Sequence, residues 1–384
     1  VIPDHEFEDG FCRHCGYEDS TYHFLRVFPN ADHNAGGGYT SNNSQDGSKL
    51  SITDGVAEHW NMKYFDTYQT LTGLEKGVYK LRLQGYSRIS AWDAIDAVGE
   101  NYYDQEYGTP NEEYYPLHHN SMYYVEKQQT GQRIANRFMD ITAGMQKHKL
   151  STFVESSTVN EDGWVPNSKA AANVYFGKGL YWNEPLYFYV ESENDTLHAG
   201  LANNLYINGN WTVWDTWRQE KVSDDADLAI AKIKEQQTKA LQDLNVFEGQ
   251  ASLHEAYNRA ADAIETASTL EEVFSLADIL SRYPQLIRAS HQAYLDYEAA
   301  IENIASERAA RPELYGEYTA LLDTYLNENK AEVEGLKNGT YPYILETKLL
   351  DNDELKAEAA FAKELLENAI RTSITPGTDL SSLI

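Results

Sequence analysis

Two short stretches, Lys63-Tyr-Phe-Asp-Thr-Tyr-Gln-Thr-Leu71 and Val78-Tyr-Lys-Leu-Arg-Leu-Gln-Gly-Tyr86, decide how this chain folds. Apolar and polar residues alternate along both. Because successive side chains of a strand point to opposite faces, this alternation predicts strands with one buried face. Glu184-Pro-Leu-Tyr-Phe-Tyr-Val190 and Thr196-Leu-His-Ala-Gly-Leu201 repeat the pattern. Glycine and asparagine clusters separate these runs, and several short strands with such turn signals favour an antiparallel sandwich.

The pattern changes near Val222, after which apolar residues recur every three or four positions. This spacing is typical of helices that bury one stripe against a core. The stretch Ser268-Thr-Leu-Glu-Glu272 resembles a capping box and predicts the start of one such helix. We therefore expect an α-helical bundle after the sandwich. Its first stripe consists of Leu253, Tyr257, Ala261 and Ile264.

Charge and hydropathy exclude several classes of partner. The 384 residues carry a net charge of −29, and both halves are acidic, with −16 from Ser223 onward and −13 before it. No basic stripe is available for phosphate contacts, so nucleic acid and anionic membranes are poor partners. No apolar run approaches the roughly 18 residues that span a bilayer. The chain opens on Val1 without a targeting segment, so we expect a mature or trimmed chain of an exported protein.

These observations divide the chain into four parts and predict a multidomain all-β plus all-α protein. Residues 1–24 form a small Cys/His element, and residues 25–222 form the sandwich. Residues 223–374 form the helical bundle. Residues 375–384 change character again and are expected to link to a following module.

Five stretches of the predicted sandwich carry a more specific pattern: Ala57-Glu-His-Trp-Asn61, Phe65-Asp-Thr-Tyr-Gln-Thr-Leu-Thr-Gly-Leu74, Gly77-Val-Tyr-Lys-Leu-Arg-Leu-Gln-Gly-Tyr-Ser-Arg88, Pro166-Asn-Ser-Lys-Ala-Ala-Ala-Asn-Val-Tyr-Phe176 and Asn210-Trp-Thr-Val-Trp-Asp-Thr-Trp-Arg218. In this order they resemble the galactose-binding-like, carbohydrate-binding-module-like β-sandwiches of secreted or surface proteins of gut Gram-negative anaerobes, in which helical segments often follow. The resemblance implies an antiparallel jelly-roll sandwich that binds sugar without catalysis, secreted or on the outer membrane. It also implies a structural calcium site to which Asp215, in the last strand, contributes a carboxylate.

The stretch from Ala91 to Tyr124 interleaves aromatic rings with carboxylate and amide side chains. Pyranose rings stack their C–H faces on aromatic rings, and their hydroxyls need short acceptors and amides. A protein interface and simple packing of the loop onto the sandwich explain the same composition. The residues predicted to contact sugar are Trp92, Tyr102, Tyr103, Asn111, Tyr114 and Tyr115.

The two cysteines, Cys12 and Cys15, have the C-x-x-C spacing that lets two thiolates reach one metal. The segment resembles short zinc-knuckle elements of secreted bacterial proteins, with His5 as a third zinc ligand and His23, or alternatively His14, as the fourth. A disulfide between the two cysteines and a pair of free thiols are the alternatives.

Enzyme signatures are otherwise lacking. His254-Glu-Ala-Tyr-Asn258 begins like the H-E-x-x-H zinc motif but ends in Asn, and no nucleophile elbow, Walker loop or dinucleotide fingerprint occurs. We therefore predict a non-catalytic carbohydrate-binding protein whose partners are glycans and other modules or surface proteins. The alternatives are an adhesin or structural interaction module, and an accessory region of a larger glycoside hydrolase.

Overall fold

The computed structural model describes residues 6–8, 11–12, 19, 22, 24–25, 28–33, 37–43, 49–62, 64–88, 121–139, 157–160, 163–203, 210–242, 244 and 251–284, with single helical residues between 299 and 327. Contacts divide the chain into two compact units, residues 1–245 with 260–285 and residues 246–259 with 286–384. The strands and sites described below belong to the first unit.

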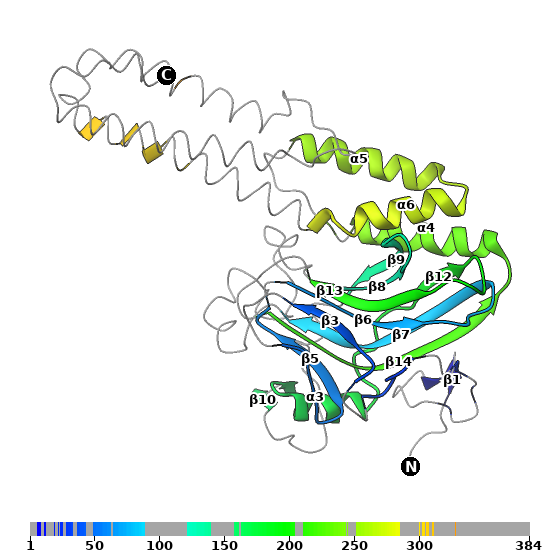
Figure 1. Ribbon diagram of the computed structural model, residues 1–384. Coiled ribbons are helices and arrows are strands. Elements are labelled where there is room, and N and C mark those ends of the chain that lie inside the picture. The colour runs from blue at the N-terminus through cyan, green and yellow to red at the C-terminus, as the bar shows by residue number, and fades with distance from the viewer. Residues whose placement is uncertain are drawn as a thin grey trace. The chain divides into compact units, whose positions relative to one another are not determined.

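Two five-stranded antiparallel sheets pack face to face in the first unit (Figure 1), which confirms the predicted sandwich at this level. Sheet I has the order β12-β7-β14-β5-β4, and sheet II has the order β3-β6-β13-β8-β9. The strands of sheet I are β12 (Leu186–Val190), β7 (Gly77–Arg88), β14 (Trp211–Ser223), β5 (Val56–Trp60) and β4 (Ser51–Thr53). Those of sheet II are β3 (Thr40–Asn43), β6 (Phe65–Leu71), β13 (Leu197–Asn203), β8 (Ser121–Lys127) and β9 (Gln132–Phe138).

Strand β6 shows why the sequence folds this way. Every second residue from Phe65 to Leu71 is buried, and the residues between them are half-buried or exposed. On the buried side, the Thr67 hydroxyl lies 2.8 Å from Nε2 of His59, which comes from β5 of the other sheet. The His59 ring stacks on Phe65 with centroids 4.1 Å apart. The predicted alternation therefore separates the inter-sheet core from an outer face.

Helix α3 (Lys169–Phe176) covers the outer face of sheet I (Figure 1). Ser168 caps its N-terminus, with the hydroxyl accepting a hydrogen bond from the Ala171 amide at 3.1 Å. This helix was not predicted from the sequence. We call the buried residues beneath it the covered-face cluster: Val56, Tyr86, Ala171, Ala172, Tyr175, Phe176, Tyr181, Trp211 and Val213.

Helices α4 (Ala226–Gln242) and α6 (Leu270–Leu280) pack along the edge strands β12 and β9. The Gln236 side chain of α4 exchanges two hydrogen bonds with the backbone of Tyr187 in β12, accepting from its N–H and donating to its carbonyl oxygen. The predicted capping box is confirmed at the start of α6, where Thr269 and Glu272 bond reciprocally.

The compact unit defined by contacts thus continues past Val222, where the composition changes, and includes α4, α6 and residues 260–266. Helix α5 (Ala251–Thr266) also has the predicted helical character. The rest of the predicted bundle up to residue 374, apart from single helical residues, and the predicted linker at 375–384 lie outside the described residues.

Two small hairpins complete the first unit. Strands β1 (Phe7–Glu8) and β2 (Phe11–Cys12) pair antiparallel near the N-terminus. Strands β10 (Ser157–Asn160) and β11 (Gly163–Pro166) pair antiparallel just before α3.

Candidate functional site

The tyrosine-rich insert leaves the sandwich at the end of β7 and returns at the start of β8. Arg88, the last residue of β7, is buried with its guanidinium 4.7 Å from the Trp211 ring centroid, and it donates to Oδ1 of Asn167 at 2.9 Å. Ser121, the first residue of β8, shares a hydrogen bond of 2.7 Å with the Thr212 hydroxyl. Both roots of the insert are therefore fixed in the sandwich. The predicted sugar contacts themselves lie outside the described residues: Trp92, Tyr102, Tyr103, Asn111, Tyr114 and Tyr115.

A second group of polar and aromatic side chains lies on the outer face of sheet II. Strand pairing brings it together, because His198 of β13 stands between Thr70 of β6 and Glu126 of β8, and Gly200 stands between Tyr68 and Tyr124. Arg133 of β9 is paired with Glu126 of β8, so its side chain lies next to that of Glu126. We call this group the sheet-face cluster: Asp66, Tyr68, Tyr124, Glu126, Arg133 and His198.

Tyr68 forms an aromatic platform in the sheet-face cluster. Its ring stacks on the His198 imidazole with centroids 3.9 Å apart and planes within 19° of parallel. His198 is buried beneath it, while Tyr68 remains half-buried. Nδ1 of His198 lies 3.5 Å from Oε1 of Glu126. The imidazole therefore covers one face of the Tyr68 ring, and Glu126 lies beside the imidazole.

Arg133 lies between the two carboxylates of the sheet-face cluster. Its Nη2 is 4.0 Å from Oδ2 of Asp66, and its Nε is 4.0 Å from Oε2 of Glu126. Its guanidinium carbon lies 4.4 Å from the centroid of the Tyr124 ring. The Tyr124 hydroxyl in turn donates to Oδ1 of Asp66. The three charged side chains keep 11–21% of their surface exposed, so solvent reaches them.

Gly200 makes this arrangement possible, since a Cβ there would lie 2.6 Å from the Thr67 carbonyl oxygen, 2.7 Å from Cβ of Tyr68 and 2.9 Å from the Tyr124 hydroxyl. The tyrosine hydroxyl crosses the strand above the glycine to reach Asp66. The sequence pattern of β13 therefore contains the small residue that the cluster needs.

The sheet-face cluster is anionic overall. Two carboxylates and one guanidinium give a net charge of −1 with His198 neutral. Burial raises the pKa of Glu126 above its ordinary value, and Asp66 raises it further while Arg133 and His198 oppose the rise. Burial also raises the pKa of Tyr124, so its hydroxyl stays protonated and can donate to Asp66.

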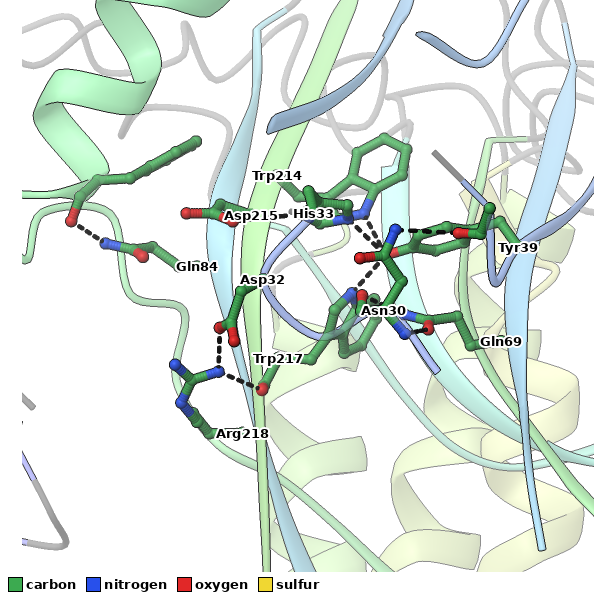
Figure 2. Close-up of polar contacts among 12 residues, drawn as sticks. Asn30, Asp32, His33, Tyr39, Gln69, Gln84, Trp214, Asp215, Trp217 and Arg218 are labelled. Carbon is green, nitrogen blue, oxygen red and sulfur yellow. Dashed lines mark hydrogen bonds and ion pairs between the residues drawn. The ribbon is translucent and has the colours of Figure 1, made fainter. Parts of the chain in front are cut away.

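The predicted calcium ligand Asp215 belongs to a different network, which joins the loop at 28–39 to β14 (Figure 2). Nδ1 of the fully buried His33 side chain lies 3.3 Å from Oδ1 of Asp215, and its Nε2 lies 2.7 Å from the Tyr39 hydroxyl. Trp214 and Trp217 donate their indole N–H groups to the same hydroxyl at 3.1 and 2.8 Å. The loop is thereby tied to the inside of β14.

This network assigns the tautomer of His33. An indole N–H can only donate, so the Tyr39 oxygen accepts from both tryptophans and its own proton points to Nε2 of His33. Burial raises the pKa of Tyr39, which keeps that proton in place. The proton of the imidazole is therefore on Nδ1, facing Asp215.

The predicted calcium and zinc sites both stay predictions. In the part of the chain that the structure describes, no three or more His, Cys, Asp and Glu side chains group around a possible ion. Asp215 faces an N–H of His33, and the neighbouring Asp32 is ion-paired with Arg218 at 2.5 Å, whereas calcium takes six to eight oxygens.

The zinc prediction is not tested. Cys12 is buried at the end of β2, whereas the other three predicted ligands, His5, Cys15 and His23, lie outside the described residues. Zinc and the disulfide alternative both stay predictions.

No protein-family model and no curated protein sequence matches this chain. The resemblance to galactose-binding-like modules therefore rests on the residues quoted from the sequence and stays a prediction. Among the helices that the structure describes, none has the length and apolar character needed to cross a bilayer.

Sequence reasoning missed the sheet-face cluster. The signal was present in β6, where Asp66 and Tyr68 fall on the polar side of the alternation. Strand register decides which residues of β8, β9 and β13 lie beside them, and that register cannot be read from the alternation alone.

Proposed function

We propose that this chain is a non-catalytic carbohydrate-binding protein, built on a jelly roll of the galactose-binding type and acting outside the cell or on its surface. The observation that carries the proposal is the sheet-face cluster. It offers a half-buried tyrosine beside two partly exposed carboxylates and a guanidinium, all on the outer face of sheet II.

The chemistry of this face suits a sugar. The C–H face of a pyranose stacks on an aromatic ring, and its hydroxyls are both donors and acceptors. Tyr68 supplies the ring, Asp66 and Glu126 supply acceptors, and Arg133 supplies donors. Thr40, Asn42 and Thr70 are exposed on the neighbouring positions of β3 and β6 and extend the polar surface around the ring.

The strand order supports a jelly roll as the particular kind of sandwich. If β5 to β9 and β12 to β14 are taken as eight consecutive strands, sheet I pairs the sixth, third, eighth and first, and sheet II pairs the second, seventh, fourth and fifth. This is the pairing order of a jelly roll, with β3 and β4 added at the edges. Secretion and calcium rest on the sequence resemblance, zinc on the spacing of Cys12 and Cys15, and the helical bundle on the apolar periodicity after Val222, and all remain part of the proposal.

The test is a glycan array probed with the whole chain, followed by titration of any glycan that binds. Tyr68→Ala is expected to weaken binding about tenfold, because the stacking surface is lost. Tyr68→Phe keeps the ring and is expected to bind like the parent protein. Tyr187→Ala is the matched control, since it removes a half-buried tyrosine from the outer face of sheet I.

The insert is tested in the same assay by Trp92→Ala and Tyr114→Ala. Loss of binding in these variants with normal binding by Tyr68→Ala would move the site to the insert and keep the carbohydrate function. Silence of the parent protein across plant, host and microbial glycans would refute the proposed function and favour the adhesin alternative.

A further inference from the structure

The Arg133 guanidinium carries two N–H groups that the described residues leave without a hydrogen bond. Nη2 and Nε each lie 4.0 Å from a carboxylate oxygen, beyond hydrogen-bond distance. The hydrogen bond described for the guanidinium runs from Nη1 to the Met122 sulfur at 3.3 Å. An oxygen beside each N···O line, about 2.8 Å from both atoms, would bridge the pair at an angle of about 90°. We call these two bridging positions the gaps, one towards Asp66 and one towards Glu126.

A hydroxyl group fits each gap. Its oxygen accepts from the guanidinium and its proton is donated to the carboxylate, with both heavy-atom distances at about 2.8 Å. Nε and Nη2 form one edge of the guanidinium, where two parallel N–H groups can engage two neighbouring oxygens. Two hydroxyls on adjacent carbons present their oxygens at this spacing.

The charge of the cluster restricts the ligand further. With a net charge of −1, the site repels a carboxylate, sulfate or phosphate placed beside Asp66 and Glu126. Uronic acids and other acidic sugars are thus disfavoured. The Tyr68 ring beside the gaps favours a ligand with an apolar C–H face.

We propose that Asp66, Arg133 and Glu126 form a clamp for the vicinal diol of a neutral pyranose, which stacks on Tyr68, and that the clamp discriminates against acidic sugars. This inference rests on the proposed carbohydrate function and names its ligand class.

The experiment uses protein-observed NMR titration of the whole chain with matched probes. Methyl galactoside and methyl glucoside are each compared with the uronic acid of the same ring, which differs by a carboxylate in place of the terminal CH2OH. We expect at least one neutral probe to shift resonances of Tyr68 and His198 and to bind about tenfold more tightly than its acid. Equal binding of the acids would overturn the inference.

Substitutions then distinguish the contribution of the Asp66, Arg133 and Glu126 clamp from that of the Tyr68 ring. Arg133→Gln is expected to weaken binding of the neutral probe about tenfold or more, because charge-assisted bonds to both hydroxyls are lost. Arg137→Gln is the matched control, an arginine of the same strand that is paired with Glu184 instead. Glu126→Gln brings the net charge of the cluster to zero and is expected to reduce the preference for neutral over acidic probes.

The outcomes distinguish this inference from the proposed function. A positive glycan array with unchanged binding by folded Arg133→Gln, checked by its thermal unfolding, would refute the clamp and leave carbohydrate binding standing. The clamp would equally be refuted if none of the four probes shifted Tyr68 at saturating concentration. A silent array would refute both the clamp and the carbohydrate function.

Discussion

The outer faces of the two sheets avoid exposing a large apolar surface in two different ways. On sheet I, helix α3 buries the covered-face cluster, which is almost wholly aromatic and aliphatic. On sheet II, the sheet-face cluster stays half-open and consists of paired charges and stacked rings. A sheet face must be covered by another layer or made polar. The comparison teaches that Tyr68 keeps part of its ring in solvent, whereas the rings of the covered-face cluster are buried.

The strongest test of the comparison is Gly200→Ala, which places a methyl group against the backbone of the central strand pair in sheet II. Because the new Cβ would lie 2.6 Å from the Thr67 carbonyl oxygen, we expect a loss of about 3 kcal/mol in the free energy of unfolding. Gly177→Ala, at the end of α3 on the covered side, meets its nearest atom at 3.4 Å and should change stability little. Urea denaturation of both variants measures the difference, and similar midpoints would contradict this view of the open face.

Replacing one buried tyrosine on each sheet face by phenylalanine compares the two faces directly. Among the described residues, the buried Tyr86 hydroxyl of the covered face has no hydrogen-bond partner, so Tyr86→Phe should stabilise the protein by about 1 kcal/mol. The Tyr124 hydroxyl of the open face donates to Asp66, so Tyr124→Phe should destabilise by about 1 kcal/mol. Chemical denaturation measures both changes in the free energy of unfolding, provided that its dependence on denaturant concentration is the same in all variants. Destabilisation by both variants would mean that the Tyr86 hydroxyl is satisfied.

The smallest expected effect concerns Glu126. Since burial raises its pKa, the folded chain holds this proton more tightly than the unfolded chain. Its stabilising contribution is therefore complete below the ordinary pKa of 4.5 and is lost as the pH rises through the folded value. Glu126→Gln should raise the melting temperature slightly at neutral pH, and the gain should vanish in acid. A gain that is the same at both pH values would contradict this origin.

Several parts of the fold were within reach of sequence reasoning. Alternation predicted the strands β6, β7, β12 and β13, although β7 and β13 are buried along nearly their whole length and not on one face only. The capping signal at Thr269 predicted the start of α6. Both signals are local, since they depend on residues only a few positions apart. Helix α3 was missed, although Ser168 followed by three alanines after Lys169 carries a start signal for a short helix.

The candidate site was less accessible for a physical reason. Asp66 and Arg133 are far apart in the chain, and only the pairing of β6, β13, β8 and β9 places them on one face. The partner of Asp215 was equally non-local, because His33 approaches it from a loop near the N-terminus. The predicted sugar contacts of the insert and the whole predicted zinc site, Cys12 included, stay predictions.

The Gln236 side chain of α4 has a practical consequence. By satisfying the backbone of Tyr187, its amide occupies a position that the strand of another molecule could otherwise take. A shortened protein that ends at Val222 would uncover this edge of β12 and, with α6 gone, that of β9. Such a fragment should self-associate. Its multivalent binding would then raise the apparent affinity measured for a glycan above that of a single site. A version trimmed after Pro284 keeps both helices and is the safer minimal protein for quantitative work.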